Sequence, residues 1–257
     1  MKRLLKEYYI FLSAVMFFSR IPVFRFFEDK PEYRNAHIKY LPLVGALLGI
    51  LQTGVFLAAN AFLPFEVSLA VTMIAGLIFT GAFHEDGLAD TADGIGGGYT
   101  KEKILSIMKD SRIGTFGTAA FVSALALKFI LLKHFSPSVI PFILIASQAV
   151  SRVFPLMMVL TSEYVSENST SKSKFVATLI SGPGFIFGLI SGLGSLFLFY
   201  PQPQPFAVFP VMVLLFLVVR KYFTDAVGGY TGDILGAIQQ IFELLFLIGV
   251  AAQWKFT

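Results

Sequence analysis

The sequence predicts an all-α protein, a polytopic bundle of membrane-spanning helices. Hydrophobic residues make up 56% of the chain and charged residues only 14%, whereas soluble domains usually contain about 25% charged residues. The mean hydropathy is +0.75, and several apolar runs approach the roughly 20 residues that a helix needs to cross a bilayer. These runs are continuous rather than alternating, which excludes a transmembrane barrel.

The apolar runs predict about seven spans in one membrane domain covering residues 1–257. The first helix, Leu4–Phe18, is too short to span comfortably, so we expect it to be interfacial or re-entrant; if it crosses, there are eight spans. The spans are then predicted at Tyr40–Leu63, Val67–Phe83, Ile113–Leu132, Val139–Leu160, Phe175–Phe199, Ala207–Val219 and Ile234–Ala252. Within the linker from His84 to Arg112, we expect a flexible glycine loop at 94–98 and a short amphipathic helix, Lys101–Lys109.

The distribution of Lys and Arg predicts the orientation. With the N-terminus in the cytoplasm, sixteen of the 20 basic side chains lie on that side. The far side keeps Lys133 and Lys255, and Lys128 and Arg152 fall inside spans. This positive-inside bias predicts a cytoplasmic (inner) membrane protein with its chemistry in the cytoplasmic segments 84–112 and 220–233.

Composition also excludes several classes of function. The net charge of +4 is spread over separate loops, which is not the pattern of a nucleic-acid-binding protein. The chain has no cysteine, so it holds no disulfide, thiolate zinc site, iron–sulfur cluster or cysteine nucleophile.

An acidic motif follows the second predicted span. Asp86, Asp90 and Asp93 are spaced i, i+4, i+7, which places three carboxylates on one face of a helix. Like charges at this spacing repel, and a divalent cation converts the repulsion into attraction. Oxygen ligands favour Mg²⁺ or Mn²⁺ over zinc. The small residues between them, Gly87 and Ala89 among them, allow a ligand or a neighbouring helix to approach. The alternative is a solvated helix end.

A basic motif, Lys109-Asp110-Ser111-Arg112, precedes the third span. Arg112, close to Gly114 and Gly117, is typical of a phosphate clamp, because a guanidinium binds phosphate with two hydrogen bonds. Lys109 would lie on the same side as the carboxylates. The alternative is a basic membrane anchor.

A glycine-rich turn at 228–232 precedes the last span and includes Thr231, with Asp233 directly after it. Free backbone N–H groups there would cradle a phosphate, and Asp233 would reach a metal. The alternative is helix capping by Thr231 or Asp233. Two further arginines are candidates for substrate binding: Arg20, near the first helix, and Arg152, inside an apolar span, where charged residues are usually functional.

These motifs together predict a Mg²⁺-dependent transferase that acts on a diphosphate-linked substrate at the cytoplasmic face. Carboxylates would hold the metal, basic side chains would bind phosphate, and one remaining carboxylate would be the general base. The enzyme alternatives are a CDP-alcohol phosphotransferase or a prenyltransferase. The non-enzyme alternative is a cation transporter, although transporters place such sites near the midplane, often in broken helices.

The motifs at 84–94, 107–115 and 228–237, together with 18–22, resemble those of the cobalamin synthase family, also called adenosylcobinamide-GDP ribazoletransferase. The resemblance covers nearly the whole chain in order and spacing. It implies that adenosylcobinamide-GDP reacts with α-ribazole, or its 5′-phosphate, with Mg²⁺ required and GMP released. Asp86, Asp90, Asp93 and Asp233 would hold metal, Asp93 and Asp86 would be catalytic, and Lys109 and Arg112 would bind phosphate.

The resemblance has one departure and leaves one property open. The segment 163–172 lacks the Tyr-Ala-Arg and Gly-Leu-Gly character of many relatives, so no role in gripping the substrate is carried onto it. The other expected partner is the lipid bilayer, and homo-oligomerisation stays open.

Overall fold

Helices make up nearly all of the chain that the computed structural model describes, which is residues 2–25, 27, 30–34, 36–165, 180–202 and 204–254. The α-helices are α1 Lys2–Phe18, α2 Pro31–Arg34, α3 Leu41–Asn60, α4 Phe65–Thr80, α5 Phe83–Gly97, α6 Lys101–Met108, α7 Thr115–His134, α8 Ile140–Ser151, α9 Val153–Thr161, α10 Gly182–Gly194, α11 Gln204–Val227 and α12 Gly232–Trp254. Short 3₁₀ helices lie at Val23–Arg25, His37–Tyr40 and Ser195–Phe199.

The all-α membrane architecture is confirmed. Among the described residues, six helical segments are long and apolar enough to cross a membrane, and α4 with α5 makes a seventh if this bent pair is one span. The predicted span Val139–Leu160 consists of α8 and α9, and the last predicted span is α12. The part of span Phe175–Phe199 before residue 180, and the basic residues Lys172, Lys174 and Lys255, lie outside the described residues.

The segment after α4 differs from the prediction. Residues 84–97 belong to the helix α5, which meets α4 at an angle of 86°. Gly81 and Ala82 make the turn with left-handed backbone (φ 66° and 56°), a conformation that is unfavourable for alanine. The predicted glycine loop at 94–98 is wrong for 94–97: these glycines are helical, and a Cβ at Gly94 would come within 2.6 Å of Met108 in α6. They allow close packing rather than flexibility.

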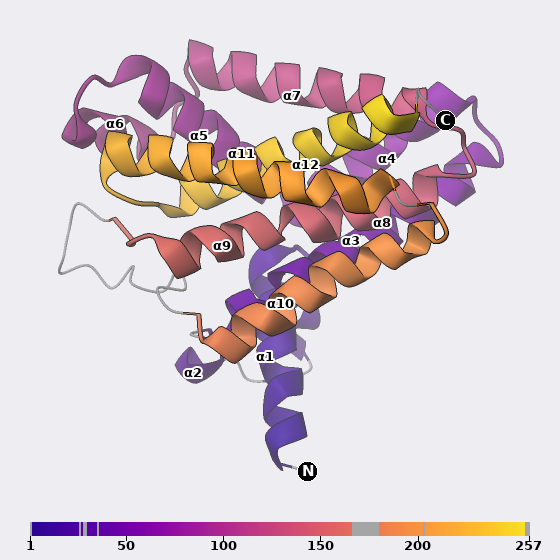
Figure 1. Ribbon diagram of the computed structural model, residues 1–257, viewed down its shortest axis with the longest axis horizontal. Helices are drawn as coiled ribbons and strands as arrows, with labels where there is room; N and C mark the ends of the chain where they lie inside the picture. The colour runs from indigo at the N-terminus through magenta and orange to yellow at the C-terminus, as the bar shows by residue number, and fades with distance from the viewer. Residues whose placement is uncertain are drawn as a thin grey trace.

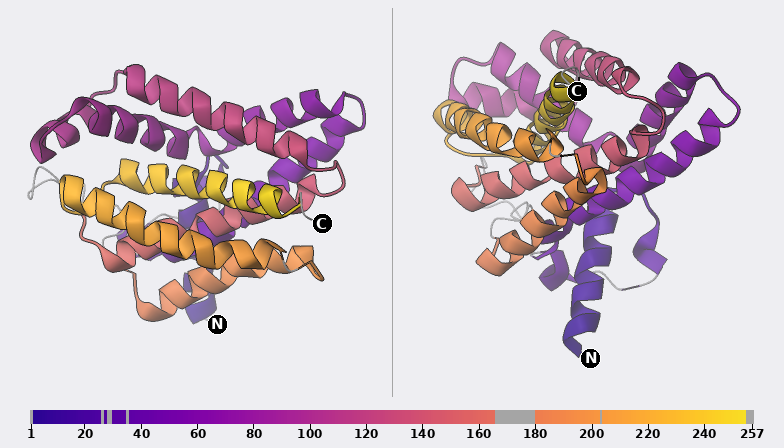
Figure 2. Two further views of the ribbon diagram at one scale, coloured as in Figure 1. Left: turned by 45° about the horizontal axis from the view of Figure 1, so that its top comes forward. Right: turned by 45° about the vertical axis from the view of Figure 1, so that its right-hand side comes forward.

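The long helices run roughly along one direction, which makes two ends of the bundle (Figure 1). One end holds α6 and the α11–α12 turn, and the opposite end holds the α3–α4 and α7–α8 connections, as both views in Figure 2 agree. Helix α5 packs on α12 and α7, while α3 packs on α8 and α4. Aromatic side chains fill the core between α9, α11 and α12, where Phe154 and Phe242 stack with ring centroids 3.9 Å apart.

Helix α1 runs at a steep angle to the other helices (Figure 1). It is not among the segments long and apolar enough to span. Its Glu7 accepts hydrogen bonds from Lys39 Nζ (2.6 Å) and Tyr40 Oη (2.9 Å), which tie α1 to the 3₁₀ helix before α3. Its expected interfacial or re-entrant position stays a prediction.

Candidate active site

The acidic motif lies along α5, so the predicted helical spacing of its three carboxylates is confirmed. Their burial differs: Asp86 is exposed, Asp90 is half-buried and Asp93 is buried. The motif is the second arm of a broken helix pair, the arrangement that the sequence analysis associated with transporters. Because Asp86 is exposed and Asp93 is buried, the row of carboxylates extends from an accessible surface into the interface between α5 and α7.

Two glycines bring Asp233 to this stripe. A Cβ on Gly87 would lie 2.7 Å from the carbonyl oxygen of Asp233, and a Cβ on Gly236 would lie 3.2 Å from the carbonyl oxygen of His84. The backbones of α5 and α12 therefore approach more closely than side chains would allow. The prediction that small residues admit a neighbouring helix is confirmed at Gly87.

This approach gathers four carboxylates. Asp90 lies within electrostatic reach of Asp86, Asp233 and Asp93. In the described part of the chain, no Lys or Arg forms an ion pair with Asp86, Asp90 or Asp233. Carboxylates that repel one another without a cationic partner fit a hard divalent cation.

No coordination shell is formed, however. Among the described residues, no three His, Asp or Glu side chains are arranged to hold one metal ion. The predicted metal ligands thus share one neighbourhood, and their role as ligands stays a prediction.

Asp93 is held by the start of α7. Its Oδ2 accepts from the backbone N–H of Gly114 (2.6 Å) and its Oδ1 from that of Gly117 (2.8 Å). A carboxylate at this position satisfies free N–H groups of the first helical turn and interacts favourably with the helix dipole. A side chain at either glycine would overlap the carboxylate. The two glycines that sequence analysis paired with Arg112 therefore serve Asp93.

Arg112 is paired with Asp110 and not with the acidic stripe. Its Nη2 lies 2.6 Å from Asp110 Oδ2, and its side chain is 86% exposed. Hydrogen bonds from the guanidinium and from the Arg112 backbone N–H lower the pKa of Asp110 to about 2. Arg112 is thus available at the surface, and its binding of phosphate stays a prediction.

Lys109 and Asp233 both act on the hydroxyl of Tyr164. Burial raises the pKa of the Tyr164 hydroxyl, Asp233 raises it further, and Lys109 lowers it. The Tyr164 hydroxyl therefore interacts electrostatically both with Asp233, a predicted metal ligand, and with Lys109, a predicted phosphate-binding residue. Nothing in the sequence motifs identified this tyrosine.

Backbone pairing holds the start of the 163–172 segment on the turn before α12. Tyr230 N–H donates to the Glu163 carbonyl (3.0 Å), and Val165 N–H donates to the Tyr230 carbonyl (2.8 Å). Residues 166–172 lie outside the described residues. Thr231 Oγ1 accepts from the backbone N–H of Ile234 (3.2 Å), so its capping role is confirmed. Its predicted contact with substrate stays a prediction.

Arg20 lies at the α4–α5 bend. Its backbone N–H donates to the Phe79 carbonyl (2.7 Å), and its side chain covers Gly81. Arg20 is exposed, and its binding of substrate stays a prediction.

Arg152 belongs to a buried polar network inside the bundle. It is 1% exposed and donates from Nη1 to the side chain and the carbonyl oxygen of Gln148. Gln148 donates to Glu243 (2.7 Å), which also pairs with Lys128 (2.5 Å). Arg152 is thus within the bundle and not at the surface where Asp86 is exposed. Its predicted contact with substrate is untested.

The same network reaches the neighbour of Asp86. Gln240 donates to Glu85 Oε1 (3.0 Å) and to Gln239 (2.9 Å), and Gln239 donates to Glu243 (3.1 Å). Lys128 lies inside a predicted span, no role was expected of Glu85, and Glu243 was not among the predicted residues. The pairing of Lys128 with Glu243 could have been predicted, because each lies in an apolar span and charges inside a membrane are normally paired.

Comparison with known proteins gives a consistent result. The model of the cobalamin-5-phosphate synthase family matches residues 10–251. A protein of Vibrio parahaemolyticus serotype O3:K6 named adenosylcobinamide-GDP ribazoletransferase is 42% identical over 250 residues, which cover 96% of this chain and 93% of that protein.

Two further relatives carry the same name. The protein of Shewanella sp. (strain W3-18-1) is 40% identical over 93% of this chain and 92% of its own length. The protein of Leptospira interrogans serovar copenhageni is 38% identical over 99% of both chains. No solved structure matches the chain.

Proposed function

Because this chain belongs to the cobalamin-5-phosphate synthase family, we propose that it transfers the adenosylcobinamide-phosphate moiety of adenosylcobinamide-GDP to α-ribazole or its 5′-phosphate. The family relationship makes the chain an enzyme of the adenosylcobinamide-GDP ribazoletransferase type. In the proposed reaction, a ribose hydroxyl of the acceptor attacks the cobinamide-side phosphorus. The phosphoanhydride bond breaks and GMP leaves.

The observation that carries this proposal is the convergence of Asp86, Asp90 and Asp233 without a cationic partner. Asp86 and Asp233 would hold Mg²⁺ next to Asp90. The bound ion would supply charge neutralisation on the diphosphate as the anhydride bond breaks. The fit rests on the mutual repulsion of the carboxylates, which the α5–α12 contact at Gly87 enforces.

The contacts favour Asp90 over Asp93 as general base. Both oxygens of Asp93 accept backbone N–H bonds from α7, so both are already engaged in holding the α5–α7 interface. Asp90 is half-buried beside Asp86 and Asp233, and its partial burial, together with repulsion from these neighbours, favours its uptake of a proton. We therefore propose that Asp90 is the general base that accepts the proton of the acceptor's hydroxyl group, and that Asp93 positions α5 against α7.

Basic side chains would hold the substrate phosphates. Lys109 is electrostatically coupled to Tyr164 beside Asp233, and Arg112 is exposed on the α6–α7 linker. The end of the bundle with α6 also holds Lys101 and Arg220, whereas Lys133 is at the end with the α7–α8 connection (Figure 1). This asymmetry supports a cytoplasmic active site in the inner membrane.

A direct assay tests the function. The full-length protein in lipid nanodiscs is expected to release GMP from adenosylcobinamide-GDP only when α-ribazole and Mg²⁺ are both present. Absence of GMP release from a sample that remains folded would contradict the proposal.

A further inference from the structure

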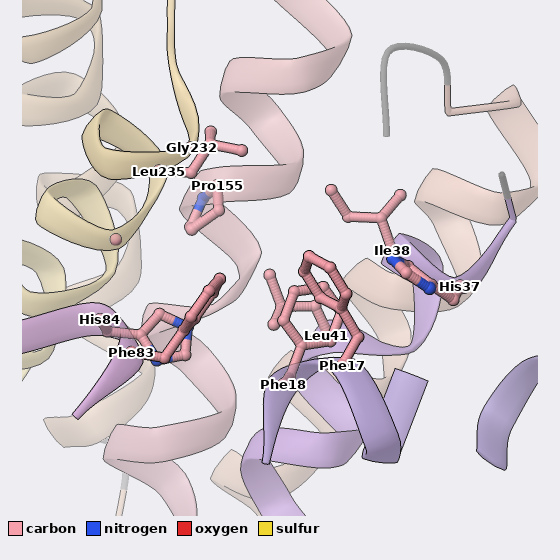
Figure 3. A pocket seen from close by; sticks show the side chains of 11 residues that line it. Phe17, Phe18, His37, Ile38, Leu41, Phe83, His84, Pro155, Gly232 and Leu235 are labelled. Atoms are coloured by element: carbon pink, nitrogen blue, oxygen red, sulfur yellow. The ribbon is translucent and has the colours of Figure 1, made fainter. Parts of the chain in front are cut away.

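An apolar pocket opens beside the N-terminal end of α5 (Figure 3). The space between its walls is ≈ 450 Å³, a figure that includes solvent at its open mouth. Its walls come from α1, the 3₁₀ helix before α3, and α3, α5, α9 and α12. They include Phe17, Phe18, Leu41, Phe83 and Leu235. We call this space the aromatic pocket.

The aromatic pocket contains one polar group that lacks a partner. Only His37 and His84 contribute side-chain nitrogens among its eleven lining residues. His37 is engaged with Ser13 Oγ (3.4 Å). His84 is 3% exposed, and its Nδ1 is buried with no hydrogen-bond partner. A buried polar atom without a partner is costly, so its presence in a pocket wall points to a ligand that supplies the missing hydrogen bond.

The pocket lies next to the N-terminal end of the acidic stripe. Phe83 precedes Asp86 by three residues on α5, so both lie on the same side of the helix, one turn apart. On the facing helix, the lining residue Gly232 directly precedes Asp233. A molecule whose flat ring fills the pocket would thus extend its next group toward the carboxylates.

We propose that the aromatic pocket receives the benzimidazole base of α-ribazole, with His84 hydrogen-bonded to the free ring nitrogen of that base. This inference rests on the proposed function and identifies where the acceptor binds in it. The ribose would then lie between the pocket and the carboxylates, where its attacking hydroxyl meets Asp90.

The chemistry of the three ring systems in the reaction favours the acceptor base. Guanine carries an amino group, a carbonyl and a ring N–H, which would find few partners among apolar walls and would be costly to bury. A corrin macrocycle with amide arms is too large and polar. Dimethylbenzimidazole is uncharged, flat and apolar except for one free ring nitrogen. It matches edge-to-face aromatic walls, such as Phe17 against Phe83 (centroids 5.7 Å apart).

The test separates acceptor binding from turnover. In nanodiscs, Phe83→Ala is expected to raise the KM for α-ribazole roughly tenfold through the lost aromatic contact. His84→Asn is expected to raise it roughly fivefold through the lost hydrogen bond. The KM for adenosylcobinamide-GDP should stay unchanged. Phe187→Ala is the matched control, because Phe187 on α10 is 40% exposed and Phe83 is 42% exposed.

Equilibrium binding provides a readout that does not depend on turnover. Free dimethylbenzimidazole, followed by its own fluorescence, is expected to bind the wild-type chain and to bind both pocket variants more weakly. If Phe83→Ala unfolds, Phe83→Leu replaces it, with a smaller effect in the same direction.

Three outcomes would overturn the inference. An unchanged acceptor KM in both variants would mean that the pocket holds no substrate, and a raised KM for adenosylcobinamide-GDP would assign it to the nucleotide. Loss of dimethylbenzimidazole binding when lipid acyl chains are added would assign it to lipid. A wild-type chain without GMP release contradicts the proposed function itself, whereas normal turnover with unaffected variants contradicts only this assignment.

Discussion

The backbone N–H of Gly117 donates to Asp93 Oδ1 at 2.8 Å, and the absent side chain of Gly117 leaves the space that the carboxylate occupies. This contact joins the innermost acidic residue of α5 to the first turn of α7. It combines a charge-assisted hydrogen bond with a favourable helix-dipole interaction. The position of α5 therefore depends on Gly117, which contributes only its backbone N–H and the absence of a side chain.

Gly117→Ala is expected to destabilise the protein by about 1–3 kcal/mol, because the new Cβ displaces the Asp93 carboxylate from its donors. Thermal unfolding in detergent measures the change. Gly54→Ala is the control, since no atom lies within 4 Å of a Cβ at that helical position, and it should be neutral or slightly stabilising. Equal destabilisation by both variants would contradict the proposed contact.

Asp90→Asn and Asp93→Asn are expected to separate chemistry from structure. Loss of the proposed base should lower kcat by roughly 10²–10⁴-fold. The same variant should keep or raise the melting temperature, because it relieves repulsion from Asp86 and Asp233. Asp93→Asn should instead lower the melting temperature. A wild-type kcat in Asp90→Asn would exclude it as the base.

Mg²⁺ is expected to raise the melting temperature of the substrate-free protein by neutralising the repelling carboxylates. The rise should grow with Mg²⁺ concentration, disappear with a chelator and be reduced in Asp86→Asn and Asp233→Asn. Asp225→Asn is a suitable control, because Asp225 is paired with Lys221 (2.8 Å) on α11. A shift of the same size in all variants would show that the ion acts elsewhere.

Lys128→Met is expected to cost about 3–5 kcal/mol of stability, because it removes the cation that pairs directly with the buried Glu243. The double variant Lys128→Met/Glu243→Gln should recover part of that loss. Lys133→Met provides the comparison: its pair with Glu66 (3.3 Å) is exposed and should contribute little. Chemical denaturation of all three variants measures the difference. A double variant less stable than Lys128→Met would contradict the pairing.

Much of the fold was predictable because a bilayer leaves few choices. Apolar runs near 20 residues must form helices to satisfy their own backbone hydrogen bonds, and this predicted the spans from Tyr40 to Ala252. The bend at Gly81 and Ala82 was not predictable, because the left-handed conformation of an alanine is unfavourable locally and is imposed by tertiary packing. The helical state of residues 94–97 was also not predictable from their glycine content, because it depends on close packing against α6.

The sequence by itself determined the chemical inventory of the site: three carboxylates at helical spacing, nearby basic residues and an acid before the last span. Only the tertiary structure decided how these groups are used. It places Asp233 beside Asp86 through Gly87, engages Asp93 with α7, pairs Arg112 with Asp110 and buries Arg152 with Gln148. Spacing along one helix follows from the helical repeat alone. Contacts between helices depend on which small residues permit close approach and which charges must find a partner.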